Sequence, residues 1–116
     1  MNNNLFAITA AKKAIKTTCE AFKINELQAR MLVAVYCANE RSQYPDMGDI
    51  VEALGEAQRQ GCYTPMRRLC SKRLIYGTEN KAKTSKRGKN PVNYTISPKG
   101  IEIVNEFDVI LTAYST

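Results

Sequence analysis

The chain has 116 residues, 44% of them hydrophobic, and a formal net charge of +6. This length suits one domain with a hydrophobic core, and we expect a single domain over residues 1–116. No stretch approaches the ~18 apolar residues that cross a bilayer, and the first residues lack the features of a secretion signal. We therefore expect a soluble cytoplasmic protein without membrane association.

The sequence contains no histidine, and its four cysteines have spacings that suit no common zinc site. Hydrolytic triads and most general-base arrangements need histidine, so we expect no metal, no cofactor and no enzymatic activity. Cys19 and Cys37 fall on apolar helix faces and should be buried. Cys62 and Cys70 flank a basic segment, where redox sensing is an alternative to a role in the core.

Positive charge is concentrated in the second half of the chain. Between Arg59 and Lys99 there are eleven basic residues and one acid, Glu79, whereas residues 1–58 carry six basic and seven acidic residues. Such segregation predicts a surface that attracts a polyanion. A solvated surface that only maintains solubility is the alternative. Because the charge coincides with a helix and a loop, the pattern favours a nucleic acid.

Three helices are expected before this basic region. Residues 5–23 carry one apolar stripe and form an N-terminal helix. Asn25 and Gln28 match a capping box that opens a second helix, whose apolar side chains on nearly every side predict the buried centre of the fold. Asp46 caps a short third helix, which Gly55 ends.

A basic helix follows a turn that has a glycine at each end. Threonine is a good cap and proline suits the first helical position, so Thr64 and Pro65 predict a helix over about residues 64–73. Two short helices joined by such a turn indicate a helix-turn-helix. The turn presents Arg59 and Gln60, and the polar side of the helix carries Thr64, Arg67, Arg68, Ser71 and Lys72.

The period changes to that of strands after the basic helix. Residues 74–76 and 92–96 are rich in β-branched and aromatic side chains, and the polar segment between them predicts a hairpin with a basic wing over about residues 77–91. Ser97 and Pro98 repeat the cap-plus-proline start and open a helix over residues 98–115. The candidate contacts of the wing are Lys81, Lys83, Lys86, Arg87 and Lys89.

The terminal helices carry more apolar side chains than one domain easily buries. On the last helix, Ile101 and Val109 lie outside the main apolar stripe. A partner subunit would cover such residues, so we expect a homodimer. The expected interface consists of Ile8, Ile15, Phe22, Ile101, Val109 and Tyr114.

The predicted fold class is mainly α with a small β-hairpin, as a winged helix-turn-helix over residues 25–97 with a terminal helix on each side. The segments IVEALG, MRRLCSKRLIY and NYTISPKGIEIVNEF resemble MarR-like and PadR-like transcriptional regulators, over about residues 25–107. The resemblance implies a recognition helix in the major groove of double-stranded DNA, a wing on the minor groove or backbone, and a two-fold dimer. It also implies that Thr64, Arg67, Arg68 and Ser71 face the groove and that Lys83, Lys86, Arg87 and Lys89 form the wing tip.

Two departures from the family pattern affect the recognition helix. The turn before it is longer than usual, and Arg73 occupies a position that is usually glycine. Other roles also stay open for single residues: Arg67 and Arg68 could pair with Glu52 or Glu56, the wing cations could be a charged loop without a partner, and Tyr63 and Tyr94 are either core residues or platforms for bases.

Two functions fit these predictions. The first is a sequence-specific, homodimeric DNA-binding regulator, a repressor that occupies a palindromic site and is held at the nucleoid through DNA. The second is a non-catalytic winged-helix module that binds DNA non-specifically or binds a protein partner, for example in a replication or mobile-element complex. Half-sites about 34 Å apart would favour the first. The sequence does not identify a small-molecule effector.

Overall fold

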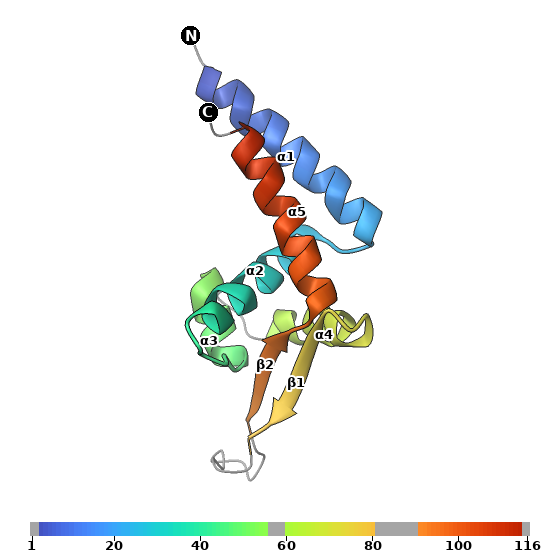
Figure 1. The fold of residues 1–116 in the computed structure, drawn as a ribbon. Helices are drawn as coiled ribbons and strands as arrows, with labels where there is room; N and C mark the ends of the chain where they lie inside the picture. Colours follow the sequence, from blue (N-terminus) through green and yellow to red (C-terminus); the bar gives the residue numbers. More distant parts are fainter. Residues whose placement is uncertain (1–2, 56–59, 81–90, 115–116) are drawn as a thin grey trace.

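The computed structural model describes residues 3–55, 60–80 and 91–114. Their elements are α1 (Asn3–Phe22), α2 (Glu26–Glu40), α3 (Met47–Leu54), α4 (Gln60–Ser71), β1 (Ile75–Glu79), β2 (Val92–Ile96) and α5 (Pro98–Tyr114) (Figure 1). The two strands pair antiparallel as a hairpin. A helix-turn-helix followed by a hairpin is a winged helix, so the predicted fold class, mainly α with a small β-hairpin, is confirmed.

The elements form two regions, which we call the arm and the body. The arm consists of α1 and α5, which lie side by side and extend away from the rest of the chain (Figure 1). The body consists of α2, α3, α4 and the hairpin, and the base of α5 rests on it (Figure 1). The molecule is elongated, with principal extents of 56 × 28 × 25 Å. Among the described helices, none is long and apolar enough to span a membrane.

The predicted caps of α2, α3 and α5 are present. The backbone amide of Asn25 donates to Gln28 Oε1 at 2.9 Å and that of Gln28 donates to Asn25 Oδ1 at 2.8 Å, which completes the capping box of α2. Asp46 caps α3 in the same way, and Gly55 ends α3 with a φ of +69°. Ser97 Oγ accepts from the amide of Gly100 at 3.0 Å and caps α5.

Close packing explains the glycine in the first turn of α5. A Cβ atom at Gly100 would lie 2.4 Å from the carbonyl oxygen of Leu74, a distance that real Cβ atoms essentially never show. Ser97 Oγ donates to the same oxygen at 2.9 Å. The Ser-Pro-Lys-Gly segment therefore fixes the start of α5 against the end of the α4 connection.

The centre of the core lies on α2. The side chains of Met31, Leu32 and Val35 have no exposed surface. Val33 and Cys37, however, lie one turn apart on a side that is open, and Val33 is 38% exposed. The expectation of a helix buried on nearly every side, and of a buried Cys37, is therefore wrong, because the elements packed against α2 leave this strip uncovered.

The carboxamide of Asn39, near the end of α2, holds the hairpin on the body. It accepts from the amide of Ile96 at 2.8 Å and donates to the carbonyls of Gln43, at 2.9 Å, and Tyr94, at 3.4 Å. The amide of Tyr94 also donates to the carbonyl of Pro45 at 2.9 Å. The loop before α3 thus lies along the outer edge of β2 and is bonded to it.

Three helices end on a residue in the left-handed backbone conformation that is not glycine. These residues are Lys23 after α1, Ser42 after α2 and Arg73 after α4, with φ of +58°, +58° and +59°. At the end of α4 the amide of Arg73 donates to Cys70 and that of Leu74 donates to Leu69, both at 3.0 Å, as in a Schellman motif. The position where the family usually has glycine is therefore one that favours glycine for steric reasons.

Candidate nucleic-acid interface

The basic helix begins earlier than the sequence predicted. Instead of a cap at Thr64, α4 begins at Gln60, and Pro65 is its sixth residue. The cap rules favour proline in a first turn, yet packing overrides them here, because Cys62 in the first turn is 2% exposed and holds this turn against the core. Gln60 therefore belongs to the helix rather than to the turn, and Arg59 falls outside the described residues.

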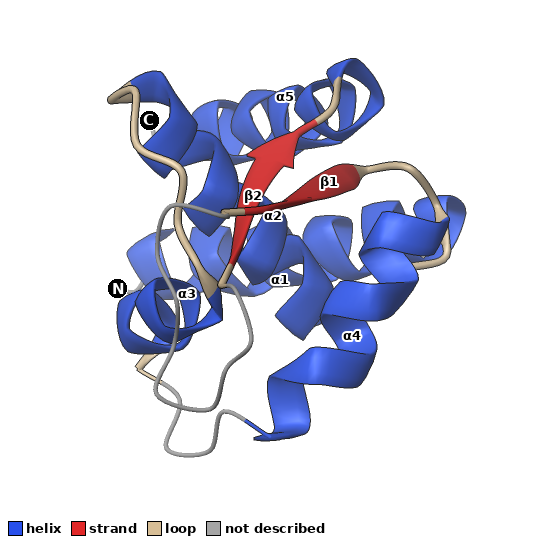
Figure 2. Cartoon of the chain, turned by 90° about the horizontal axis from the view of Figure 1, so that it is seen from below, coloured by secondary structure: helices blue, strands red, loops and turns tan. Residues whose placement is uncertain are grey.

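The two sides of α4 have opposite character. Cys62, Met66 and Leu69 are buried on the inner side. The opposite side of the helix carries exposed polar side chains, which recur at the spacing of about one helical turn. This outward stripe consists of Gln60, Thr64, Arg67, Arg68 and Ser71. Figure 2 shows α4 along one side of the hairpin, with α3 on the opposite side.

Both arginines of the outward stripe are available for a ligand. Arg67 and Arg68 are exposed, and within the described part of the chain neither forms an ion pair with an acidic side chain. The alternative of pairing with Glu52 is thus not realised, while Glu56 falls outside the described residues. Ser71 Oγ donates to the carbonyl of Arg67 at 3.0 Å. Its oxygen keeps the capacity to accept a hydrogen bond.

Lys72 does not join the outward stripe. The helix ends at Ser71, and the half-buried Lys72 directs its ammonium group to the carbonyl of Lys23 at the end of α1. The prediction placed Lys72 on the polar side because it assumed that the helix continued to residue 73. A cation at this carbonyl instead stabilises the negative end of α1.

One tyrosine adds to the candidate surface. Tyr63 lies three residues after Gln60 and four before Arg67, and its side chain is 44% exposed. Tyr94 is half-buried and packs against the core. Burial raises the pKa of Tyr94, and the nearby Cys70, Tyr63 and Asp46 raise it further. The helical spacing of Tyr63 was the signal in the sequence that could have assigned it to the outward stripe.

The cysteines of α4 do not have the properties of a redox switch. Such a switch needs an accessible thiol with a lowered pKa. Burial instead raises the pKa of Cys70, and Cys62 is 2% exposed. These properties indicate that Cys62 packs in the core and Cys70 packs beside it. Cys19 is buried as predicted, and burial raises its pKa as well.

The residues predicted for a dimer separate into two groups. Ile8 and Val109 are 53% and 64% exposed, and Phe22 is 37% exposed. Ile15 and Ile101 are half-buried and pack against the core of the same chain. The side chain of Tyr114 falls outside the described residues. The wing cations Lys81, Lys83, Lys86, Arg87 and Lys89 also lie outside them.

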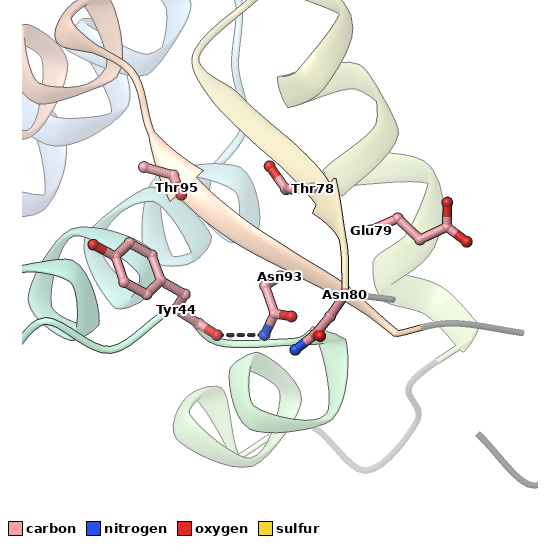
Figure 3. A pocket seen from close by; sticks show the side chains of 6 residues that line it. All are labelled: Tyr44, Thr78, Glu79, Asn80, Asn93 and Thr95. Carbon is pink, nitrogen blue, oxygen red and sulfur yellow. Dashed lines mark hydrogen bonds between the residues drawn. The ribbon is translucent and has the colours of Figure 1, made fainter. Parts of the chain in front are cut away.

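A hollow beside the outer face of the hairpin has a different chemical character. Figure 3 shows Tyr44 lying across from Asn93, whose Nδ2 donates to the Tyr44 carbonyl at 2.6 Å. The lining contains a single carboxylate and no nucleophile with an adjacent base, so it does not form a hydrolytic site. In the described ranges, no group of three or more His, Cys, Asp or Glu side chains is placed to hold a metal. The lining residues are Tyr44, Thr78, Glu79, Asn80, Asn93 and Thr95.

No family model and no curated protein matches the chain. Solved structures do match. MepR, a transcription regulator of the Staphylococcus aureus multidrug efflux pump MepA, is 21% identical with a TM-score of 0.73, over 99% of this chain and 79% of that chain. A complex of S. aureus MepR with DNA is 23% identical with a TM-score of 0.76, over 97% and 86%. The YusO protein from Bacillus subtilis is 14% identical with a TM-score of 0.71, over 93% and 70%.

These similarities extend along nearly the whole chain, including both helices of the arm. At these sequence identities the structural likeness establishes the fold and does not assign a function. The chain therefore has the same fold as MepR and YusO, and the winged-helix fold that its sequence predicted is confirmed.

Proposed function

We propose that the chain is a regulator of transcription that binds double-stranded DNA in a sequence-specific manner. The observation that carries this proposal is the outward stripe of α4, whose two exposed arginines have no acidic partner among the described residues. The MepR complex with DNA supports it, because a protein of the same fold binds DNA. A basic helix held on a rigid body is suited to enter a major groove.

The side chains of the stripe match the groups that distinguish base pairs. The guanidinium groups of Arg67 and Arg68 can each donate two hydrogen bonds to the acceptors of a guanine. The carboxamide of Gln60 can pair with an adenine, and the hydroxyls of Thr64 and Ser71 can donate to or accept from several bases. We assign base readout to these residues, with Tyr63 beside them.

The remaining predicted cations are assigned to the DNA backbone. Lysines contribute mainly as point charges, which suits phosphate contacts that lack sequence information. We therefore propose that Arg59 and the wing residues Lys81, Lys83, Lys86, Arg87 and Lys89 contact phosphates or the minor groove. Lys72 is left out of this set because its ammonium group is bonded to Lys23.

The regulator would act as a homodimer formed through the arm. Ile8, Phe22 and Val109 are exposed apolar side chains on α1 and α5, and a second copy would remove them from water. Ile15 and Ile101 would support this interface from inside the same chain, and Tyr114 would extend it. A two-fold dimer presents two copies of α4 to a palindromic site, and occupation of a promoter would repress transcription.

The experiment that tests the proposal is selection of bound duplexes from a random DNA pool at about 150 mM salt, which weakens non-specific phosphate binding. A palindromic motif with half-sites about one helical turn apart is the expected result. Salt-sensitive binding without an enriched motif would contradict sequence-specific regulation. It would instead favour a non-catalytic module that binds DNA non-specifically or binds a protein, as in a replication or mobile-element complex.

A further inference from the structure

The carboxamide of Gln28 is the least expected polar group in the core. Gln28 is 4% exposed, and the only other buried polar residue in the described ranges is Ser97. Gln28 Oε1 accepts from the amide of Asn25 and completes the capping box of α2. A glutamate would perform this task equally well, since a capping box requires only an acceptor at this position. The other end of the carboxamide therefore needs a separate explanation.

That other end reaches the recognition helix. Gln28 Nε2 donates to the carbonyl of Pro65 in α4 at 3.2 Å, across 37 residues of sequence. The same carbonyl is the regular helical acceptor for the amide of Leu69. Every described buried side-chain polar atom has a partner, so this bond is part of a fully satisfied arrangement. The start of α2 and the middle of α4 are thus joined by one side chain.

The contact falls at the point where α4 is least constrained by its own backbone. Proline has no amide, so the carbonyl of Gly61 lacks the donor that a regular helix would supply. The apolar contacts of Met66 and Leu69 hold α4 on the body, but hydrophobic contacts are non-directional and fix rotation poorly. A hydrogen bond has a preferred distance and angle, so it can fix the rotation and height of the helix.

We infer that Gln28 is a positioning residue for α4, which sets the orientation of the outward stripe and thereby its selectivity among base sequences. Thr64 and Arg67 lie on either side of Pro65, so a rotation of the helix about this point would displace both. The effect on selectivity rests on the proposed function, because it requires the stripe to contact bases. The anchoring of α4 does not depend on DNA.

The first test measures amide hydrogen exchange in the full chain without DNA. Gln28→Met removes the anchor and adds no charge, and Gln28→Glu keeps the cap acceptor but removes the donor. Asn25→Ala is the matched control, since it breaks the same capping box and leaves the Nε2 contact. We expect the exchange rates of the α4 amides, including that of Leu69, to rise roughly tenfold in both Gln28 variants. In the control, the ratio of α4 to α5 exchange rates should equal that of the wild type.

The second test compares affinity for the selected duplex with affinity for a random duplex. This ratio should fall roughly tenfold in Gln28→Met, with random-duplex binding nearly unchanged, because phosphate contacts tolerate a rotated helix better than base contacts do. Equal exchange in the Gln28 variants and in Asn25→Ala would overturn the anchor. Faster exchange with an unchanged ratio would overturn its role in selectivity. A wild type without any preferred duplex would refute the proposed function, while the exchange result would still decide the anchor.

Discussion

The recognition helix and the arm are held in different ways. The inner side of α4 is buried, Gln28 bonds its middle and a Schellman motif closes its end, so what remains exposed is a polar, cationic stripe. In the arm, α1 packs mainly along α5, and Ile8 and Val109 stay exposed. The difference teaches that the body presents a surface suited to a polyanion, whereas the arm is suited to an apolar partner.

The largest expected effect of a single change is on the stability of the body. Leu69 on α4 has no exposed surface, so Leu69→Ala should lower the free energy of unfolding by about 2–5 kcal/mol. Ile8→Ala in the arm is the matched variant. At concentrations at which the chain is a monomer, Ile8 is 53% exposed, so its loss should stay below about 1 kcal/mol. Urea denaturation measures both. Similar losses in the two variants would show that the body does not dominate stability.

The arm should dominate association. Full burial of one apolar side chain contributes about 1.5–3 kcal/mol, which corresponds to about tenfold to a hundredfold in a dissociation constant. The double substitution Ile8→Ser with Val109→Ser should therefore raise the dimer dissociation constant by at least about tenfold. Analytical ultracentrifugation over a dilution series measures this constant. Asn105→Ser changes an exposed polar residue of α5 and should leave it unaltered. A dimer that tolerates the double substitution would place the interface elsewhere.

Local interactions account for what the sequence predicted correctly. The caps at Asn25, Asp46 and Ser97 each bond an amide only three residues away, and Gly55 ends α3 through its own backbone. The strand over residues 92–96 was also predicted correctly. Patterns confined to one turn or one strand can be read without tertiary contacts, which is why the element order and the winged-helix fold followed from the sequence.

Long-range contacts account for what the sequence did not show. The start of α4 depends on burial of Cys62, and its anchor joins Gln28 to a carbonyl 37 residues away. Asn39 bonds the hairpin to α2 across 55 and 57 residues. Lys72 does not lie on the outward stripe, because the helix ends one residue before it and its ammonium group bonds a carbonyl at the end of another helix. None of these partners can be identified from periodicity.

The stripe on α4 can be separated from other surface cations by substitution. Arg67→Ala should weaken binding to the preferred duplex by about 1–3 kcal/mol and relax the choice of base at one position. Arg41→Ala is the control, because Arg41 is exposed at the end of α2 and outside the stripe. Fluorescence anisotropy at fixed salt measures both affinities. An equal loss of affinity on every duplex would assign Arg67 to the phosphate backbone instead.

The smallest expected effect compares the ends of α4 and α1, where Arg73 and Lys23 have the same left-handed backbone conformation. A residue with a Cβ atom is disfavoured there by about 1–2 kcal/mol, and glycine recovers part of this at the cost of a more flexible unfolded chain. Arg73→Gly and Lys23→Gly should therefore each raise the free energy of unfolding by about 0.5–1 kcal/mol in urea denaturation. Ser42→Gly, at the end of α2, is the reference for the backbone effect, because Ser42 has the same φ of +58° as Lys23 and should gain a similar amount. If Arg73→Gly alone fails to stabilise the chain, the Arg73 side chain must contribute a compensating interaction. The end of α4 in the body would then have a stabilising contact that the end of α1 in the arm lacks.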